Sequence, residues 1–394
     1  MNSKENIVND TEKQIGTTSV DLLLAGAVYL LLAVYLPFAF FTNINMTVLQ
    51  AISIAAAVAC AFAISRISGA KKPSGAILLL IACFIFLGTV LCGLVASLLG
   101  CVCILGFLFM SAKNTSTKIF SLLPAVAAYL IAFLIVGSPV AAALALVHIP
   151  AAIALAYAFK KKLPRVSAIC HISVGIILGV TAISAAWFIS SHGLNLKSLV
   201  ETVSAVKQSL TETLASTLFS LSGELMEISQ TDAKDISTVV VGATFNLLPA
   251  IVVVLSNILA FFIQSMMTRI MIKRAQSKED IKTMVAFEMS LVSAIIFLVA
   301  MLAAVIFAEE LSVWSVTAEN VMFILMPGLI FTAVGTLRAF MFAKGPSCLG
   351  TLAYIAIIGS FVYLPTVMLP LSSIAGSAII IIHNILKAKA EKKS

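Results

Sequence analysis

Residues 118–165 decide the fold, and they read KIFSLLPAVAAYLIAFLIVGSPVAAALALVHIPAAIALAYAFKKKLPR. The apolar block from Ile119 to Phe159 is about twice as long as the roughly 20 residues that one membrane crossing needs. Lysines flank both ends of the block, and the positive-inside rule places both ends in the cytoplasm. The block is therefore predicted to be a helical hairpin that turns at Gly137-Ser138-Pro139.

The whole chain has the composition of a membrane protein. Hydrophobic residues make up 61% and charged residues 11% of its 394 residues, against about 45–50% and about 25% in soluble domains. The apolar runs are continuous rather than alternating, which favours helices over a β-barrel. We predict an all-α, polytopic helical membrane protein with about 12 transmembrane helices and both termini cytoplasmic.

The other apolar runs supply the remaining crossings. Two blocks, 76–110 and 348–386, also have cations at both ends and are predicted hairpins. The first is expected to turn between Cys92 and Gly100, and the second to break at Pro365 and Pro370. Single crossings are predicted over residues 20–41, 46–64, 166–189, 239–267, 285–308 and 321–342.

This topology divides the chain into two membrane bundles between two short tails. An amphipathic helix is predicted outside the cytoplasm within 194–236, because leucines and valines recur there at spacings of three and four from Leu199. Ser198 and Glu201 form a capping box that is expected to start it. The helix either lies on the membrane surface or over the bundle, or serves as a lid over a cavity or as a docking helix. The expected divisions are a tail 1–19, an N-terminal bundle 20–165, a C-terminal bundle 166–386 and a tail 387–394.

Several function classes are excluded by what the loops and spans contain. No Gly-rich phosphate loop occurs, so the chain is predicted to have no ATPase of its own. The formal charge of +8 is explained by orientation in the membrane and requires no nucleic acid. No paired carboxylates or metal-ligand set are found, so we expect no enzyme, no catalytic residue, no cofactor and no metal. The seven cysteines are expected to be buried as small apolar side chains.

Three polar residues recur along the span 239–267. Asn246, Asn257 and Gln264 are separated by 11 and 7 residues, which returns each to nearly the same helix face. Pro249 should kink the helix beside this stripe. The stripe is predicted either to line a polar cavity or to form hydrogen bonds between helices.

Ionisable residues within spans are candidates for function. His148 lies mid-span, two residues before Pro150, and its alternative is a neutral imidazole bonded to one backbone carbonyl. Glu288 lies about one turn inside its span, where it would couple a proton or cation, or pair with a loop lysine. The hypothetical substrate-binding cavity comprises His148, Asn246, Asn257, Gln264 and Glu288.

Gly175 and Gly179 form a smooth strip on the span 166–189. Small residues at this spacing let helices approach closely. The strip is predicted to pack within the bundle, or against a separate membrane subunit.

From residue 166 onward the chain resembles the YybS-like family of uncharacterised bacterial membrane proteins. The resemblance rests on Asn246-Leu-Leu-Pro249, on the basic cluster that follows it from Arg269, on Met326-Pro327-Gly328, and on the final hairpin ending in Lys387 and Lys389. The family is grouped loosely with the substrate-binding components of energy-coupling-factor transporters. The resemblance therefore implies small-molecule capture with a borrowed ATPase.

Two functions follow as hypotheses. The first is a small-solute transport protein, or a transporter component without its own ATPase, whose partners are the lipid bilayer, a small-molecule ligand and a membrane or ATPase subunit. The alternative is a non-transporting cell-envelope scaffold or assembly protein.

Overall fold

The computed structural model describes residues 19–42, 44–67, 74–111, 119–193, 195–225, 229–272, 287, 289–307, 313–343 and 348–391. These ranges are helical and contain no β-strand, which confirms the all-α prediction. The chain divides into unit 1, Met1–Gly193 with Ser256–Ala286, and unit 2, Leu194–Leu255 with Phe287–Ser394. The sequence suggested a division at residue 165 instead, between bundles 20–165 and 166–386.

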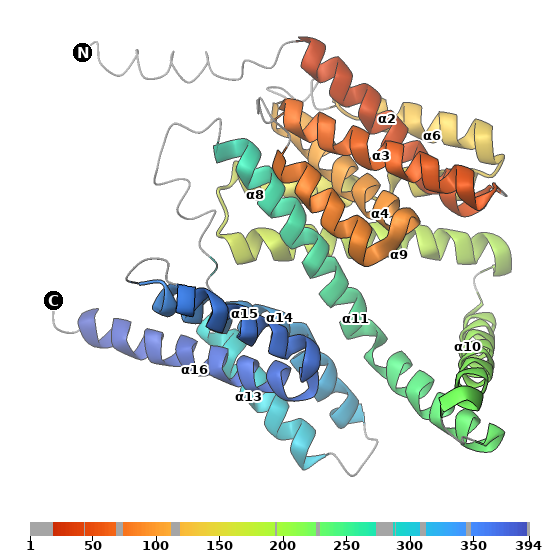
Figure 1. The fold of residues 1–394 in the computed structure, drawn as a ribbon. Coiled ribbons are helices and arrows are strands. Elements are labelled where there is room, and N and C mark those ends of the chain that lie inside the picture. The colour runs from red at the N-terminus through yellow and green to blue at the C-terminus, as the bar shows by residue number, and fades with distance from the viewer. Residues whose placement is uncertain are drawn as a thin grey trace, which may run out of the picture. The chain divides into compact units, whose positions relative to one another are not determined.

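Unit 1 is built from helices that are apolar on every face, as expected of membrane spans. It is completed by the end of α11, Gln230–Ile272, from Ser256 onward. The helices are α2 Ser19–Phe41, α3 Met46–Ile67, α4 Ser74–Ser111, α6 Leu123–Val136, α7 Pro139–Ala142, the 3-10 helix η1 Ala143–Leu146, α8 Ile149–Lys160 and α9 Arg165–His192 (Figure 1).

The predicted turn at residues 137–139 is confirmed. Gly137 has the left-handed conformation, with φ 73°, which ends α6, and glycine adopts it without steric cost. Ser138 then caps α7, because its hydroxyl accepts a hydrogen bond from the amide of Ala141 at 3.3 Å. Pro139 occupies the first turn of α7, where its missing N–H costs nothing. The chain reverses direction here (Figure 1).

The turn predicted between Cys92 and Gly100 is wrong, because these residues lie inside α4. The glycines of this segment serve close packing. A Cβ atom added at Gly93 would lie 2.7 Å from Cβ of Ser53 on α3. One added at Gly100 would lie 2.6 Å from Cδ1 of Leu32 on α2. Both glycines let neighbouring helices approach α4 more closely than any larger residue would.

Three helices of unit 2, α13 Leu291–Ile306, α14 Val313–Met341 and α16 Pro365–Glu391, pack around a small apolar core. A Cβ atom added at Gly376 of α16 would strike the carbonyl of Leu329 on α14, so these two helices touch through backbone atoms. Buried Phe297 of α13 joins Leu329 in the core cluster. The helices of unit 2 are α10 Leu196–Leu225, the first part of α11 Gln230–Ile272, α13 Leu291–Ile306, α14 Val313–Met341, α15 Cys348–Tyr363 and α16 Pro365–Glu391.

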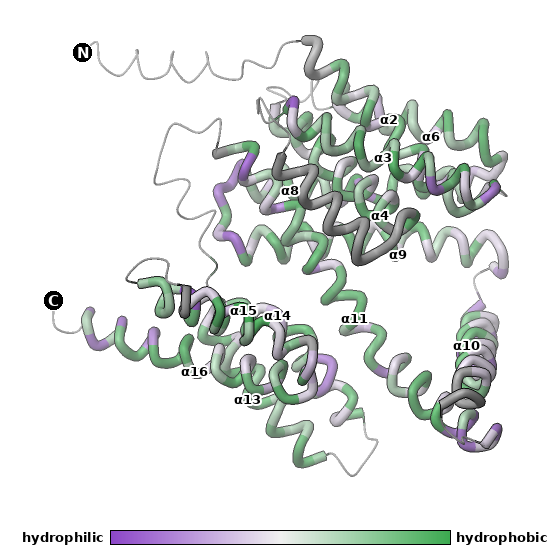
Figure 2. Tube along the Cα trace, in the orientation of Figure 1, coloured by the Kyte–Doolittle hydropathy of each residue, from purple (hydrophilic) through white to green (hydrophobic). Residues whose placement is uncertain are grey.

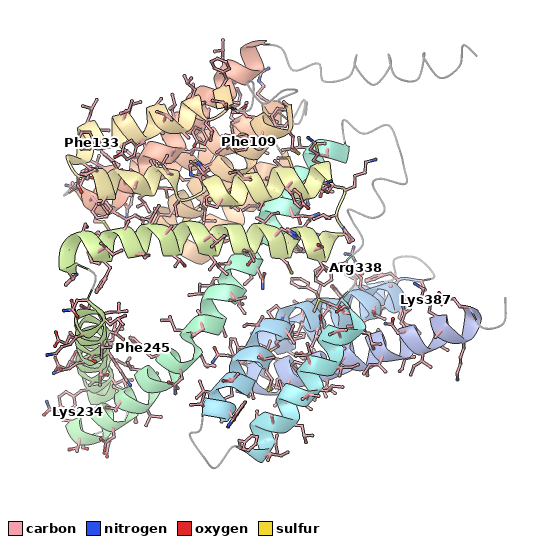
Figure 3. The ribbon with its side chains drawn as sticks, turned by 180° about the vertical axis from the view of Figure 1, so that it is seen from behind. Phe109, Phe133, Lys234, Phe245, Arg338 and Lys387 are labelled. Atoms are coloured by element: carbon pink, nitrogen blue, oxygen red, sulfur yellow. The ribbon has the colours of Figure 1, made fainter. Side chains whose placement is uncertain are left out.

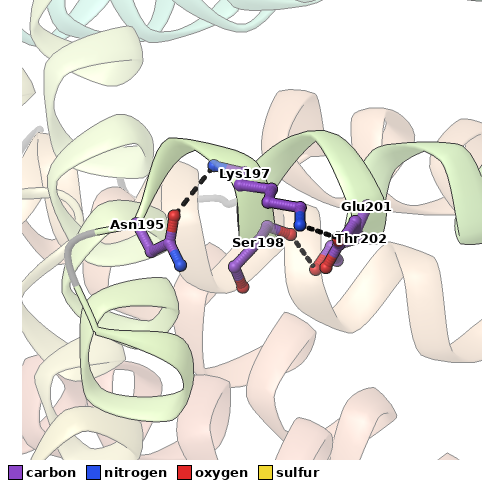
Figure 4. A network of polar contacts seen from close by, with 5 residues as sticks. All are labelled: Asn195, Lys197, Ser198, Glu201 and Thr202. Carbon is purple, nitrogen blue, oxygen red and sulfur yellow. Dashed lines mark hydrogen bonds and ion pairs between the residues drawn. The ribbon is translucent and has the colours of Figure 1, made fainter.

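Helix α10, Leu196–Leu225, lies within the segment 194–236 where an amphipathic helix is predicted, and it begins one residue after Asn195 rather than at Ser198. Asn195 Oδ1 accepts a hydrogen bond from the amide of Lys197 at 3.0 Å, so asparagine supplies the cap (Figure 4). Ser198 lies inside the first turn, where its carbonyl accepts from the Thr202 hydroxyl at 2.8 Å. Glu201 faces Lys197 at 3.9 Å instead of reaching back to a capping serine. The apolar residues of α10 are exposed, among them Leu199, Val203, Val206 and Leu210.

The described residues contain eight helices long and apolar enough to cross a membrane and three shorter apolar helices. Pro365 begins α16 as predicted, whereas Pro370 lies inside that helix. Helix α13 starts after Ser290, which caps it by accepting from the amide of Ser293 at 3.1 Å, so it is shorter than the predicted span 285–308.

Hydrophilic residues gather at helix ends (Figure 2). In unit 2, Arg338 and Lys387 lie toward the same end (Figure 3).

Candidate functional site

The span Pro139–Lys160 is interrupted half-way along its length. Helix α7 gives way to η1, residues 147 and 148 form a turn, and α8 begins at Ile149. Pro150 accounts for the interruption, because its nitrogen has no hydrogen to donate and its ring clashes with the preceding turn of a regular helix. Irregular backbone at membrane depth persists only where protein buries it or where it lines a cavity. The surroundings of this break are therefore the first candidate for a site.

His148 lies at the break and is completely buried, with 0% exposed. Its Nε2 lies 2.6 Å from the hydroxyl of Tyr29, and the two rings meet edge to face with their centroids 5.2 Å apart. His148 Nδ1 makes no hydrogen bond within the described part of the chain. A buried polar atom without a partner costs about 1–3 kcal/mol, so its retention suggests a use.

The chemistry of the pair of His148 and Tyr29 depends on which of the two groups donates the hydrogen bond between them. If the Tyr29 hydroxyl donates to Nε2 of His148, then Nδ1 carries a hydrogen and is an unpaired donor. If Nε2 donates instead, Nδ1 presents an unpaired lone pair. In both tautomers one imidazole nitrogen is fixed by the phenol and the other is able to bind a polar solute group or exchange a proton.

Helix α9 closes the break through its two glycines. A Cβ atom added at Gly175 would lie 2.6 Å from Cα of Ala151, and one added at Gly179 would strike the carbonyl oxygen of Val147. Because glycine has no Cβ, the backbone of α9 rests directly against the interrupted segment. The glycine strip therefore packs inside unit 1, which is the first of the two uses predicted for it.

A second polar cluster in unit 1 surrounds Arg165, the first residue of α9. Arg165 donates from Nε to Oε1 of Gln264 at 3.1 Å and from a terminal nitrogen to the hydroxyl of Ser265 at 2.9 Å. Its guanidinium carbon lies 4.7 Å from the ring centroid of Phe261. Gln264 in turn donates to the Thr268 hydroxyl at 2.9 Å. These contacts tie α9 to the end of α11 and account for the burial of Gln264.

A third polar arrangement lies in unit 2 at Pro249. The amide of Ala250 donates to Oδ1 of Asn320 on α14 at 3.0 Å, and Nδ2 of Asn320 donates to the carbonyl of Asn246 at 2.9 Å. Residues 246 and 250 are the pair that a regular helix bonds to each other. The carboxamide of Asn320 is therefore inserted into the hydrogen-bond ladder of α11, next to the position where Pro249 lacks a donor.

The five residues predicted to line a cavity have different surroundings. His148 and Gln264 are both buried in unit 1, but the first contacts Tyr29 and the second Arg165. Asn257 is half-buried in the same unit, and the side chain of Asn246 is exposed in unit 2. Glu288 lies outside the described residues.

Tyr29, Arg165 and Asn320 are the residues that sequence reasoning missed. Tyr29 carried a usable signal, because tyrosines of membrane helices prefer the interfaces and this one lies near the middle of its span. From the sequence, Arg165 is recognisable only as one more cation after the apolar block that ends at Phe159. Asn320 was placed just before a span predicted to start at residue 321, whereas α14 begins at Val313.

The described residues contain no group of three or more His, Cys, Asp or Glu that could hold a metal ion. Cys60, Cys92, Cys101 and Cys103 are buried, as predicted, whereas Cys170 is exposed.

Comparison with protein families gives a match to the family described as Predicted membrane protein (DUF2232), over residues 80–377. This range begins well before residue 166, where the YybS-like resemblance starts. Comparison with curated proteins and with solved structures gives no match.

Proposed function

We propose that this chain, which belongs to the family described as Predicted membrane protein (DUF2232), transports a small solute across the membrane. The observation that carries the proposal is the interrupted span Pro139–Lys160 with the buried pair of His148 and Tyr29 at its break. Interrupted helices form the solute sites of many transporters, because their freed backbone groups and nearby polar side chains bind the solute.

In this proposal the solute contacts His148 through Nδ1, while Tyr29 fixes the orientation of the ring. Asn257 and Gln264 are proposed as further cavity residues because the end of α11 belongs to the same unit. The assignment of Asn246 and Glu288 to the substrate-binding cavity stays a prediction.

The proposed transporter resides in a bacterial plasma membrane. It performs no catalysis, and a gradient or a partner's ATPase drives it. The proposal includes a YybS-like relationship to energy-coupling-factor components. Such a relationship implies that a partner subunit carries the ATPase.

The test uses purified protein in liposomes and a bacterial small-molecule extract as the probe. Vesicles are incubated with the extract with and without a proton gradient, and accumulated molecules are identified by mass spectrometry. We expect a solute to accumulate with the wild-type protein and with His171→Leu, whose ring is exposed on α9. We expect it to be lost with His148→Leu and reduced with Tyr29→Phe.

Two outcomes contradict the proposal in different ways. Accumulation no greater than in empty liposomes under every gradient would refute transport by the chain alone. Accumulation that begins only when a candidate ATPase subunit is added would then support transport driven by a partner's ATPase. Undiminished accumulation with His148→Leu would leave transport standing but remove the site.

The second candidate function, an envelope scaffold, is favoured by the exposed apolar residues of α10. A photo-crosslinker at Leu210, which is 48% exposed, would then capture a single envelope protein in stoichiometric yield. Crosslinking to lipid alone would count against the scaffold.

A further inference from the structure

Helix α10 is connected to a membrane span at each end. Helix α9 ends at His192, and α10 begins at Leu196. At its other end α10 stops at Leu225, and α11 begins at Gln230. Both α9 and α11 are long and apolar enough to cross a membrane. Trp187, near the end of α9, is 49% exposed, and tryptophans of membrane helices prefer the membrane surface. Helix α10 therefore starts close to that surface.

A contact with α11 ties the middle of α10 to the depth at which that span begins. The last charged residue before the span is Asp235, and no Asp, Glu, Lys or Arg follows until Arg269. Gly242 lies about 10 Å beyond Asp235 along the helix, at 1.5 Å per residue. The side-chain nitrogen of Lys207 on α10 lies 4.0 Å from the place that a Cβ atom of Gly242 would occupy. The middle of α10 therefore lies beside the first turns of the uncharged stretch.

Four apolar residues form an exposed stripe along the first half of α10. The members of this apolar stripe are 41% to 48% exposed, and they are Leu199, Val203, Val206 and Leu210. Their spacings of four, three and four residues keep them on one face of the helix. A contiguous apolar face left open in this way marks a contact with a membrane or with another protein.

The polar groups of α10 suit a position at a membrane surface. Four threonine hydroxyls donate to the carbonyl four residues earlier in the helix at 2.8–2.9 Å, and they belong to Thr202, Thr211, Thr213 and Thr217. Hydroxyls that are bonded within the helix need no water, so they can enter the headgroup region. At 100° per residue, Glu201 and Glu212 lie on the side of α10 opposite the apolar stripe. Glu201 pairs there with Lys197 at 3.9 Å (Figure 4).

The charge of α10 indicates which force holds the helix in place. Two positive and three negative side chains occur along it, those of Lys197, Lys207, Glu201, Glu212 and Glu224. Because these charges nearly cancel, neither anionic headgroups nor a strongly charged protein would attract the helix. Burial of the apolar stripe is therefore the contribution that remains, and uncharged lipid supplies it as well as anionic lipid does.

We propose that α10 lies in the membrane interface, with its apolar stripe inserted among the lipid acyl chains and its glutamates facing water. The connections to two spans and the contact at Gly242 place the helix at this depth, so the bilayer itself is the apolar partner within reach. The proposal assigns to lipid the surface that an envelope scaffold would use for a protein. It does not depend on the transport function.

The test is site-directed spin labelling of the full-length protein in phosphatidylcholine vesicles. Cys170, which is exposed, is first replaced by serine, and this protein labelled without any added cysteine gives the background signal. Single labels are then placed on the stripe with Val206→Cys and Leu210→Cys, and on the opposite side with the matched controls Glu201→Cys and Glu212→Cys. Power saturation measures how often each label collides with oxygen, which dissolves among acyl chains, and with a nickel chelate, which stays in water.

We expect the ratio of oxygen collisions to nickel collisions to be several-fold higher on the stripe than at the two glutamate positions. The stripe labels should lie about 5–10 Å below the headgroup surface. Replacing phosphatidylcholine with phosphatidylglycerol, or adding salt, should leave these depths unchanged.

Three results would overturn the proposal. Frequent nickel collisions at all four positions would place α10 in water. Few collisions with either reagent on the stripe would show that protein covers it. Insertion that requires phosphatidylglycerol would show that charge, rather than the apolar stripe, holds the helix. Because all four substitutions are at exposed positions, they are not expected to disturb folding, and far-ultraviolet circular dichroism of each variant checks this.

Discussion

Replacing Asn320 with leucine removes the side chain that is inserted into α11. The wild-type carboxamide accepts from the amide of Ala250 at 3.0 Å and donates to the carbonyls of Asn246 and Val316 at 2.9 and 2.8 Å. The first two bonds join α14 to α11, and the third is local to α14. Leucine has nearly the same size, so the substitution isolates the loss of hydrogen bonds.

The size of the effect follows from what the freed groups can do afterwards. Interhelical hydrogen bonds in membrane proteins contribute about 0.6 kcal/mol each, which gives about 1.2 kcal/mol for two. Leaving both backbone groups unpaired would cost more, about 1–3 kcal/mol each. That larger cost is not expected, because the amide of residue 250 and the carbonyl of residue 246 can bond to each other as in a regular helix. We therefore predict a loss of about 1 kcal/mol.

The assay is reversible unfolding in mixed micelles by titration with sodium dodecyl sulfate, followed by far-ultraviolet circular dichroism. Asn384→Leu is the matched control, because among the described residues the hydrogen-bond partner of Asn384 Nδ2 is the carbonyl of Ile380 in its own helix, at 2.8 Å. The difference between the two variants reports the bonds to α11. If Asn320→Leu loses no more unfolding free energy than Asn384→Leu, the inserted carboxamide does not couple the helices and the reasoning fails.

Three further predictions use the same unfolding measurement. Gly179→Ala should destabilise the protein by about 1–3 kcal/mol, because the added methyl group would collide with the backbone carbonyl of Val147. Gly26→Ala should stabilise it by about 0.5–1 kcal/mol, because nothing lies within 4 Å of the added methyl group and alanine favours a helix more than glycine does. Equal effects of the two would contradict the packing argument. Tyr29→Phe should cost about 1–3 kcal/mol, since it leaves neither nitrogen of His148 bonded, and a neutral result would show that the pair contributes nothing to stability. Arg165→Lys should cost about 1–2 kcal/mol because an ammonium cannot make both side-chain bonds and also stack on the ring as a planar guanidinium does, and full stability would argue against a fixed Arg165.

Most helices were predictable from the sequence because a membrane span is defined by local properties. The predicted span 20–41 corresponds to α2, Ser19–Phe41, and the predicted 166–189 to α9, Arg165–His192. Glycine, serine and proline at 137–139 fix a turn through their own backbone preferences. Gly93 and Gly100 gave the same local signal, but they serve contacts with other helices, which no local pattern reveals.

The candidate site was predictable only in part, for the same physical reason. His148 stands out as an ionisable residue beside a proline in an apolar span. Its partner Tyr29 is 119 residues away, and the contact arises from packing rather than from any spacing in the sequence. Asn320 likewise reaches across 74 residues to Asn246.

The division of the chain into units has a consequence for the order in which the protein is assembled. Unit 1 is not a continuous piece of chain, because Arg165 depends on Gln264 and Ser265, which are made only after residues 194–255 of unit 2. At about 5–20 residues per second, these 62 intervening residues delay completion by several seconds. During that interval α9 is already synthesised while the guanidinium at its first residue still lacks its partners. A nascent chain that ends at Gly193 is therefore an incomplete bundle, and the second half of α11 is the piece that closes it.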